Sequence, residues 1–123
     1  MEMIVNNDVH ATPLRHILTA ISAECQELSE FLDRFQHALS PALFRVAEES
    51  ECHRDIQSLD LLAQRLASLS GYVLEISTAI PEGTKVDSRD ALANIPLTEL
   101  QYRLKGAPLP KDLTHLSGEL DLF

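Results

Sequence analysis

The sequence predicts an all-α protein: a long antiparallel helical hairpin that dimerises into a four-helix bundle, followed by a linker and a short C-terminal docking helix. Hydrophobic residues make up 45% of the chain, but aromatic residues only 5%, and Trp is absent. This aliphatic balance favours helices packed on helices over a β-sandwich. Apolar residues also recur at alternating steps of three and four along two long segments, the spacing of amphipathic helices. The length of 123 residues suits one domain.

The first helix is predicted over residues 13–39, after a flexible N-terminal arm of residues 1–11. Thr12 supplies a capping side chain, and Pro13 suits the first helical position. An apolar heptad seam follows without a break. Its members are Leu14, Leu18, Ile21, Cys25, Leu28, Leu32, Phe35 and Leu39.

The second helix is predicted over residues 41–80. Ser40 and Pro41 repeat the start signal, and the residue before a proline is disfavoured in a helix, so the first helix should end near Leu39. Pro81 and the glycine after Glu82 stop the second helix. The polar stretch 48–54 predicts a kink or a short unwound segment. The apolar seam of this helix comprises Leu59, Leu62, Leu66, Leu69, Val73, Ile76 and Ile80.

A short connection between two long helices produces an antiparallel hairpin, here residues 12–80. A single hairpin with seams of this length leaves much apolar surface in water. Pairing two hairpins into a four-helix bundle covers that surface, so we expect a homodimer.

The chain changes character at residue 81. Residues 81–110 contain turn formers and little periodicity and are predicted to be a linker, with a possible short helix at 97–105. Residues 111–123 form an acidic and hydrophobic peptide. We expect it to dock on a partner's groove or, alternatively, to pack on its own bundle. Its candidate binding residues are Leu113, Leu116, Leu120, Leu122 and Phe123.

Charge and composition exclude several classes of function. Ten Lys and Arg against 19 Asp and Glu give a net charge of −9, which opposes binding to nucleic acid or to anionic membranes. The first residues resemble no signal peptide, and no apolar run approaches the ~20 residues of a membrane span. The two cysteines, Cys25 and Cys52, fall in helical patterns and are expected to be reduced thiols. We therefore expect a cytoplasmic protein.

One acid and one amide are candidates for a functional site. Asp60 and Gln64 lie four residues apart in the leucine-rich second helix, so they are neighbours on its surface. With Leu59 and Leu62 on the buried seam, the pair falls on a single outward stripe. The simplest alternative is that the pair is ordinary solvated surface.

The context of this pair resembles the CheZ family of chemotaxis phosphatases. The motif reads Ile56-Gln57-x-x-Asp60-Leu61-x-x-Gln64, and CheZ proteins carry a DxxxQ motif on the second long helix of a hairpin. The small CheT proteins are the most similar in size. An apolar acidic peptide that follows a linker, as CheZ has at its end, is a second likeness. The Leu-Leu-Ala between the acid and the amide differs from the family's usual residues.

The resemblance implies hydrolysis of the aspartyl phosphate of a CheY-like response regulator. The receiver domain supplies its own Mg²⁺ and lysine, so this chain would need no cofactor of its own. Gln64 would hold a water in line with phosphorus, as an orienting glutamine does in GTPases. Asp60 would pair with the receiver's lysine.

Two other functions remain open. The hairpin and the C-terminal peptide could form a non-enzymatic adaptor that binds a chemotaxis signalling protein. Alternatively, His16, predicted to point outward, could accept a phosphoryl group as in histidine phosphotransfer domains. The polar side chains of Glu49, Cys52 and His53 make a weak ligand set, and we expect no metal site.

Overall fold

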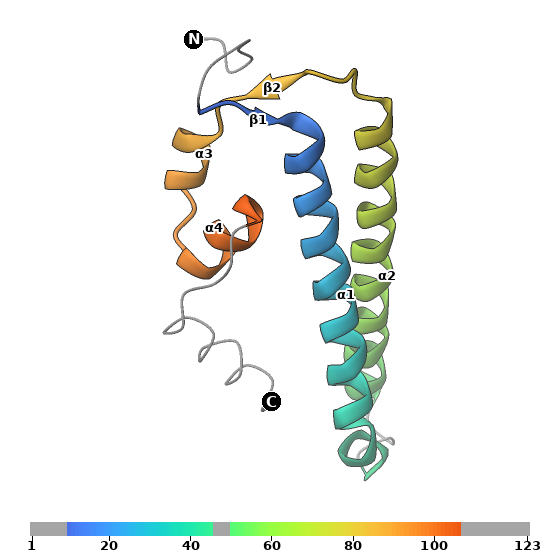
Figure 1. Ribbon diagram of the computed structural model, residues 1–123. Helices are drawn as coiled ribbons and strands as arrows, with labels where there is room; N and C mark the ends of the chain where they lie inside the picture. The colour runs from blue at the N-terminus through green and yellow to red at the C-terminus, as the bar shows by residue number, and fades with distance from the viewer. Residues whose placement is uncertain (1–9, 46–49, 107–123) are drawn as a thin grey trace.

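The computed structural model describes residues 10–45 and 50–106, and within them it confirms the predicted all-α fold (Figure 1). Two long helices form a hairpin, and two short helices follow them. A two-stranded antiparallel sheet of four residues is the remaining regular structure of this part of the chain. The elements in chain order are β1 (Thr12–Pro13), α1 (Leu14–Arg45), α2 (Ser50–Ala79), β2 (Lys85–Val86), α3 (Arg89–Ala93) and α4 (Thr98–Lys105).

Small polar side chains join α1 and α2 by hydrogen bonds between the two helices. The Ser22 hydroxyl donates to the Ser70 carbonyl at 2.8 Å, and the Ser70 hydroxyl donates to the Ser22 carbonyl at the same distance. One heptad further along, the Ser29 hydroxyl donates to the Ala63 carbonyl at 2.8 Å. Because these side chains are short, the two helices can lie close together. Each hydroxyl then reaches a backbone carbonyl of the opposite helix. A line of small residues, and not a leucine seam, therefore forms the centre of the hairpin contact.

The apolar seam predicted for the second helix is wrong in part. Among the residues of α2 whose burial the structure describes, 53–79, the buried ones are Ala63, Ser70 and Ser77. Every second residue of the predicted seam lies one position before one of these buried residues and is exposed. Their exposed fractions are 46% for Leu62, 51% for Leu69 and 40% for Ile76. Heptad spacing predicts which residues share a stripe, but it does not decide which of two adjacent stripes meets the partner helix.

Four exposed apolar side chains of the two helices share one face of the hairpin. Leu62 and Leu69 each precede a contact residue of α2 by one position, and Leu28, 44% exposed, precedes the contact residue Ser29 of α1. One residue corresponds to about 100° around a helix. In an antiparallel pair, the same angular offset brings both stripes to the same side. We call this surface, Leu28 with Leu62, Leu69 and Ile76, the apolar face.

The boundary between the two long helices differs from the prediction. α1 continues through Pro41 to Arg45 instead of ending near residue 39, and α2 begins at Ser50 instead of residue 41. Pro41 removes one hydrogen bond and crowds the preceding turn. The helix keeps its course because this proline is exposed and lies within about one turn of the end of α1. Of the kink predicted at 48–54, residues 50–54 are helical, and the rest lies outside the described residues.

The strands β1 and β2 tie the start of α1 to the chain that leaves α2. Thr12 pairs with Val86 and Pro13 with Lys85, so Pro13 belongs to a strand and not to the first helical turn. The Leu14 amide donates to the Thr84 carbonyl at 2.9 Å. Residues 1–9, most of the predicted arm, lie outside the described residues.

The predicted linker is a folded segment over most of its length. The chain after α2 forms β2, α3 and α4, and α1 lies between α2 and the α3–α4 segment (Figure 1). α4 occupies Thr98–Lys105, close to the expected 97–105, and ends at Gly106, whose φ of 71° is left-handed. Glycine adopts this conformation without strain, which makes it a natural helix stop. No helix among residues 10–45 and 50–106 is long and apolar enough to cross a membrane.

Gln36 continues the line of contact residues on α1, and its amide nitrogen is buried without a hydrogen-bond partner in the described part of the chain. An unsatisfied buried donor costs roughly 1–3 kcal/mol. We expect Gln36→Met, which keeps the length and removes the donor, to raise the free energy of unfolding by about 1 kcal/mol and the melting temperature by about 4 °C. Thermal unfolding checks this, with the exposed Gln57→Met as control. A lower melting temperature for Gln36→Met would contradict it.

Candidate functional site

The structure brings Asp60 and Gln64 together on the surface of α2. Both side chains are exposed, and the Gln64 Nε2 donates a hydrogen bond to Asp60 Oδ2 at 2.9 Å. α2 is continuous from Ser50 to Ala79, so the two residues sit one turn apart on an uninterrupted helix. Their backbone positions are therefore fixed relative to each other. We call them the Asp60–Gln64 pair.

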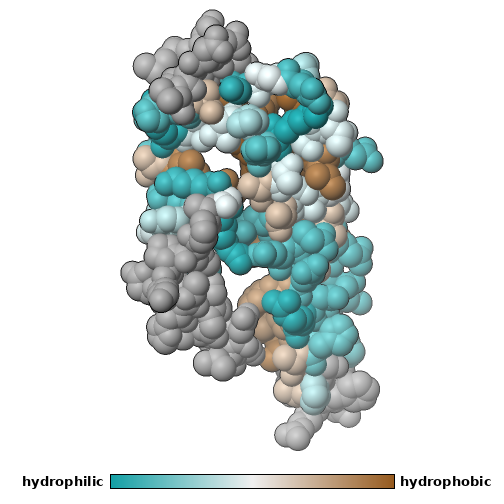
Figure 2. Space-filling model, in the orientation of Figure 1, coloured by the Kyte–Doolittle hydropathy of each residue, from teal (hydrophilic) through white to brown (hydrophobic). Residues whose placement is uncertain are grey.

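This pair lies on the side of the hairpin opposite the apolar face. Gln64 follows the buried Ala63 by one position, whereas Leu62 precedes it, so the two side chains point about 200° apart around the helix. The same geometry places Glu30, which follows Ser29, on the side of the Asp60–Gln64 pair. Covering the apolar face would leave the pair accessible. In Figure 2, hydrophilic residues cover much of the lower right side of the hairpin, and the upper part is mostly of intermediate hydropathy.

The neighbours of the pair combine negative charge with exposed apolar groups. On α1, Glu30 is exposed and its Oε1 accepts a hydrogen bond from the Gln26 Nε2 at 3.2 Å. On α2, Leu61 is 55% exposed, and Tyr72, about two turns beyond Gln64, is 66% exposed; both lie on the outward side of the helix. This surface therefore offers carboxylates for a basic side chain and two large apolar groups for contact with a protein.

The chemistry available to the pair follows from its hydrogen bond. The bond between the side chains uses one N–H of the Gln64 amide and leaves the carbonyl oxygen and the second N–H to other partners. A carboxamide can thus accept from and donate to one water molecule, but it is too weak a base to remove a proton. Asp60 keeps acceptor capacity for a lysine or arginine. The pair can position and bind, and it needs another molecule's electrophile to act on.

Most of the other predicted site residues lie outside the part of the chain that the structure describes. Leu113, Leu116, Leu120, Leu122 and Phe123 all lie outside the described residues. His16 is exposed on α1. Glu49 lies outside the described residues as well, and no group of three or more His, Cys, Asp or Glu side chains able to hold a metal occurs within the described ranges.

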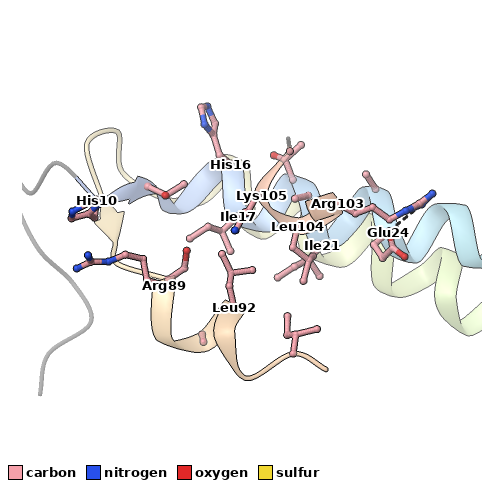
Figure 3. A pocket seen from close by; sticks show the side chains of 18 of the residues that line it. His10, His16, Ile17, Ile21, Glu24, Arg89, Leu92, Arg103, Leu104 and Lys105 are labelled. Atoms are coloured by element: carbon pink, nitrogen blue, oxygen red, sulfur yellow. Dashed lines mark ion pairs between the residues drawn. The ribbon is translucent and has the colours of Figure 1, made fainter. Parts of the chain in front are cut away.

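Sequence reasoning missed a large groove between α1, α3 and α4, with a volume of about 1150 Å³. In Figure 3 the apolar side chains of Ile17, Ile21, Leu92 and Leu104 gather in its middle, while His16 points away. The space-filling view shows the surface hollowed between α1 and the α3–α4 segment (Figure 2). We call this the α1–α4 groove. The sequence does show apolar residues spaced for a helix between 92 and 104. It does not show that this segment packs against α1, so it predicts only a short helix and not a groove.

Arg103 attaches α4 to α1 at one end of this groove. Its guanidinium forms ion pairs with Glu27 and, at 3.7 Å, with Glu24 on α1, and lies 3.8 Å from Glu99 on α4. Burial raises the pKa of the Glu24 carboxyl above its ordinary value of 4.5, Arg103 opposes this, and Glu27 and Glu99 add to it. When the Glu24 carboxyl is charged, its burial under α4 therefore lowers the stability of the docked α4.

This raised pKa predicts a pH dependence of stability. The folded state retains the Glu24 proton at a pH where the unfolded chain has lost it, so stability falls as pH rises from about 4.5 through the raised pKa. We expect Glu24→Gln to remove this fall and to melt at a higher temperature than the wild type at pH 7, with a smaller difference at pH 4. Melting curves at both values check this, with Glu30→Gln as the exposed control. An equal gain at both pH values would contradict the assignment.

The fold and the exposed pair together define a small helical-hairpin protein that presents an acid and an amide on one outward face. By sequence, the chain belongs to the family described as a domain of unknown function (DUF8776), whose model matches residues 10–123. Neither the search of curated proteins nor the search of solved structures found a match.

Proposed function

We propose that this protein accelerates hydrolysis of the aspartyl phosphate of a CheY-like response regulator, and so ends a chemotaxis signal in the cytoplasm. Gln64 enters the receiver's active site and holds the attacking water in line with phosphorus. Asp60 pairs with the receiver's lysine and fixes the orientation of α2. The receiver's own Mg²⁺ and lysine stabilise the charge on the phosphoryl group.

The observation that carries this proposal is the Asp60–Gln64 pair itself: exposed, one turn apart, joined by a 2.9 Å hydrogen bond and mounted on an unbroken helix. Positioning a water requires a group with little freedom. The bond to Asp60 restrains the amide before a partner binds, so less side-chain entropy is lost on insertion. In the complex, the receiver's lysine would bind Asp60, and the amide would turn its free atoms to the water.

Two further features support a receiver as the partner. Leu61 provides an exposed apolar contact beside the pair, Tyr72 provides another about two turns further along α2, and Glu30 adds negative charge that would attract a basic residue. The apolar face lies on the other side of the hairpin. A homodimer formed through that face would display two pairs on opposite outer surfaces, each able to engage one receiver.

The direct test follows the decay of a phosphorylated CheY-like receiver with Mg²⁺ present, with and without this protein. Faster loss of phosphate at substoichiometric amounts of protein is the expected result. Binding with an unchanged phosphate lifetime would indicate an adaptor instead. Transfer of acid-labile phosphate to His16 would indicate a phosphotransfer domain.

A further inference from the structure

We propose that the α1–α4 groove is the docking site of the chain's own C-terminal segment, residues 107–123. The groove has an apolar middle formed by Ile17, Ile21, Leu92 and Leu104, and these side chains converge from three helices (Figure 3). Its volume of about 1150 Å³ exceeds the roughly 300–1,000 Å³ of pockets for small ligands. An open apolar groove of this size suits a peptide better than a small molecule.

The composition of the segment fits this groove. Leu113, Leu116, Leu120 and Phe123 recur at steps of three, four and three, so as a helix they would form one apolar stripe. Thirteen residues, 111–123, would make a helix of about 20 Å. An amphipathic helix in an apolar groove is a common mode of peptide recognition.

Charge favours the same occupant. The groove lining contains three basic residues, Arg89, Arg103 and Lys105, against Glu24 and Glu27, in a chain whose net charge is −9. It is therefore a comparatively basic surface on an acidic protein. The segment 107–123 is acidic, with one lysine against Asp112, Glu119 and Asp121.

The individual basic side chains differ in what they can offer the segment. Lys105 is exposed and lies 5.5 Å from the centre of the Tyr102 ring, where a carboxylate can reach it. Arg89 is held by Asp87 at 2.7 Å, and this bond lowers the pKa of Asp87 to about 2. Arg103 is engaged by the carboxylates of α1 and α4. Lys105 is thus the residue best placed to contribute an ion pair.

The connection between segment and groove is also short. α4 ends at Gly106, which itself lines the groove, so residue 107 starts at the docking site. A segment tethered this closely has an effective concentration in the millimolar range. Even weak intrinsic affinity then suffices for occupancy.

A consequence for signalling rests on the proposed function. A segment held in its own groove is not free to dock on a receiver, so the groove and the receiver would compete for the same apolar residues. Weakening the groove with Lys105→Glu should then tighten receiver binding several-fold. If the protein does not bind a receiver, Lys105→Glu will show no change in receiver binding, whatever occupies the groove. The measurement described next contains no receiver and therefore tests the groove alone.

The test is amide hydrogen exchange of the full chain. We expect residues 111–123 to exchange at least tenfold more slowly than an unstructured peptide, independently of protein concentration. Leu120→Asp should remove this protection, whereas Thr114→Asp, which adds the same charge off the apolar stripe, should keep it. Lys105→Glu should weaken the protection, with Arg54→Glu, an exposed site on α2, as the matched control.

Three results would overturn the proposal. One is random-coil exchange of residues 111–123 in the wild type. A second is protection that increases with protein concentration, which would place the segment on a second copy. The third is an equal loss of protection in Thr114→Asp and Leu120→Asp. The substituted segment residues lie after α4, so these variants do not alter the described helices.

Discussion

Replacing Gln64 by alanine is expected to reduce the acceleration of receiver dephosphorylation by roughly two orders of magnitude, the scale of loss when a reacting group is misplaced. The substitution removes the amide that orients water but leaves the helix intact, because alanine is the best helix former. The decay rate of the phosphorylated receiver measures this at saturating protein. Receiver affinity should change little, since Asp60, Leu61 and Tyr72 remain.

Gln57 offers a matched control for this variant. It lies seven residues earlier on the same exposed side of α2, so Gln57→Ala removes the same group from the same helix face, two turns away. Gln57→Ala should retain full activity. Asp60→Asn, by contrast, should weaken receiver binding with a smaller effect on the rate at saturation. Equal activity of Gln64→Ala and Gln57→Ala would refute the water-positioning role.

Replacing Leu69 by glutamate is expected to weaken the proposed homodimer at least 100-fold. Burial of a leucine contributes about 1.5–3 kcal/mol, the substitution occurs in both copies, and each new carboxylate would be desolvated without a partner. Tenfold in affinity corresponds to 1.4 kcal/mol. Because Leu69 is 51% exposed in one copy, the two leucines account for part of this factor and the two desolvated carboxylates for the rest. Analytical ultracentrifugation over a concentration series measures the change.

The proposed dimer rests on a physical observation about one copy of the chain. Among the described residues no large side chain is fully buried, and the buried apolar residues are Ala63 and Val86. The described part of a single copy therefore has almost no core, and we infer that a second copy at the apolar face would supply one. Leu61→Glu is the control, because Leu61 is exposed on the same helix but outside this face. A monomeric wild type, or equal effects of both variants, would exclude the interface.

The sequence was sufficient for the two long helices and for the neighbouring placement of Asp60 and Gln64. Both follow from helical periodicity, which depends only on local geometry. The outward position of the pair also follows, because any buried stripe centred near residues 59–63 leaves positions 60 and 64 at its edge or beyond. The helical periodicity alone is therefore enough to place Asp60 and Gln64 side by side on an outward face of α2.

The sequence could not reveal features that depend on distant contacts. The seam between the helices is built from serine and alanine, because reciprocal hydrogen bonds such as Ser22 with Ser70 allow close approach. Hydrophobicity alone favours the leucine stripe beside it. Likewise, residues 81–106 look like a linker until α1 provides Glu24 and Glu27 for Arg103. Pro41 within α1 shows that a local breaker can be overruled near a helix end.

The heptad repeat of small residues along α1 and α2 would also tolerate another alignment of the helices. Sliding α2 by seven residues, about 10 Å, would bring Ser29 opposite Ser70 and Ser22 opposite Ser77, again small against small. The strands β1 and β2, with the Leu14–Thr84 hydrogen bond, prevent this displacement at the open end of the hairpin. Four residues of sheet thereby hold the observed alignment, and with it the position of Gln64 along α1.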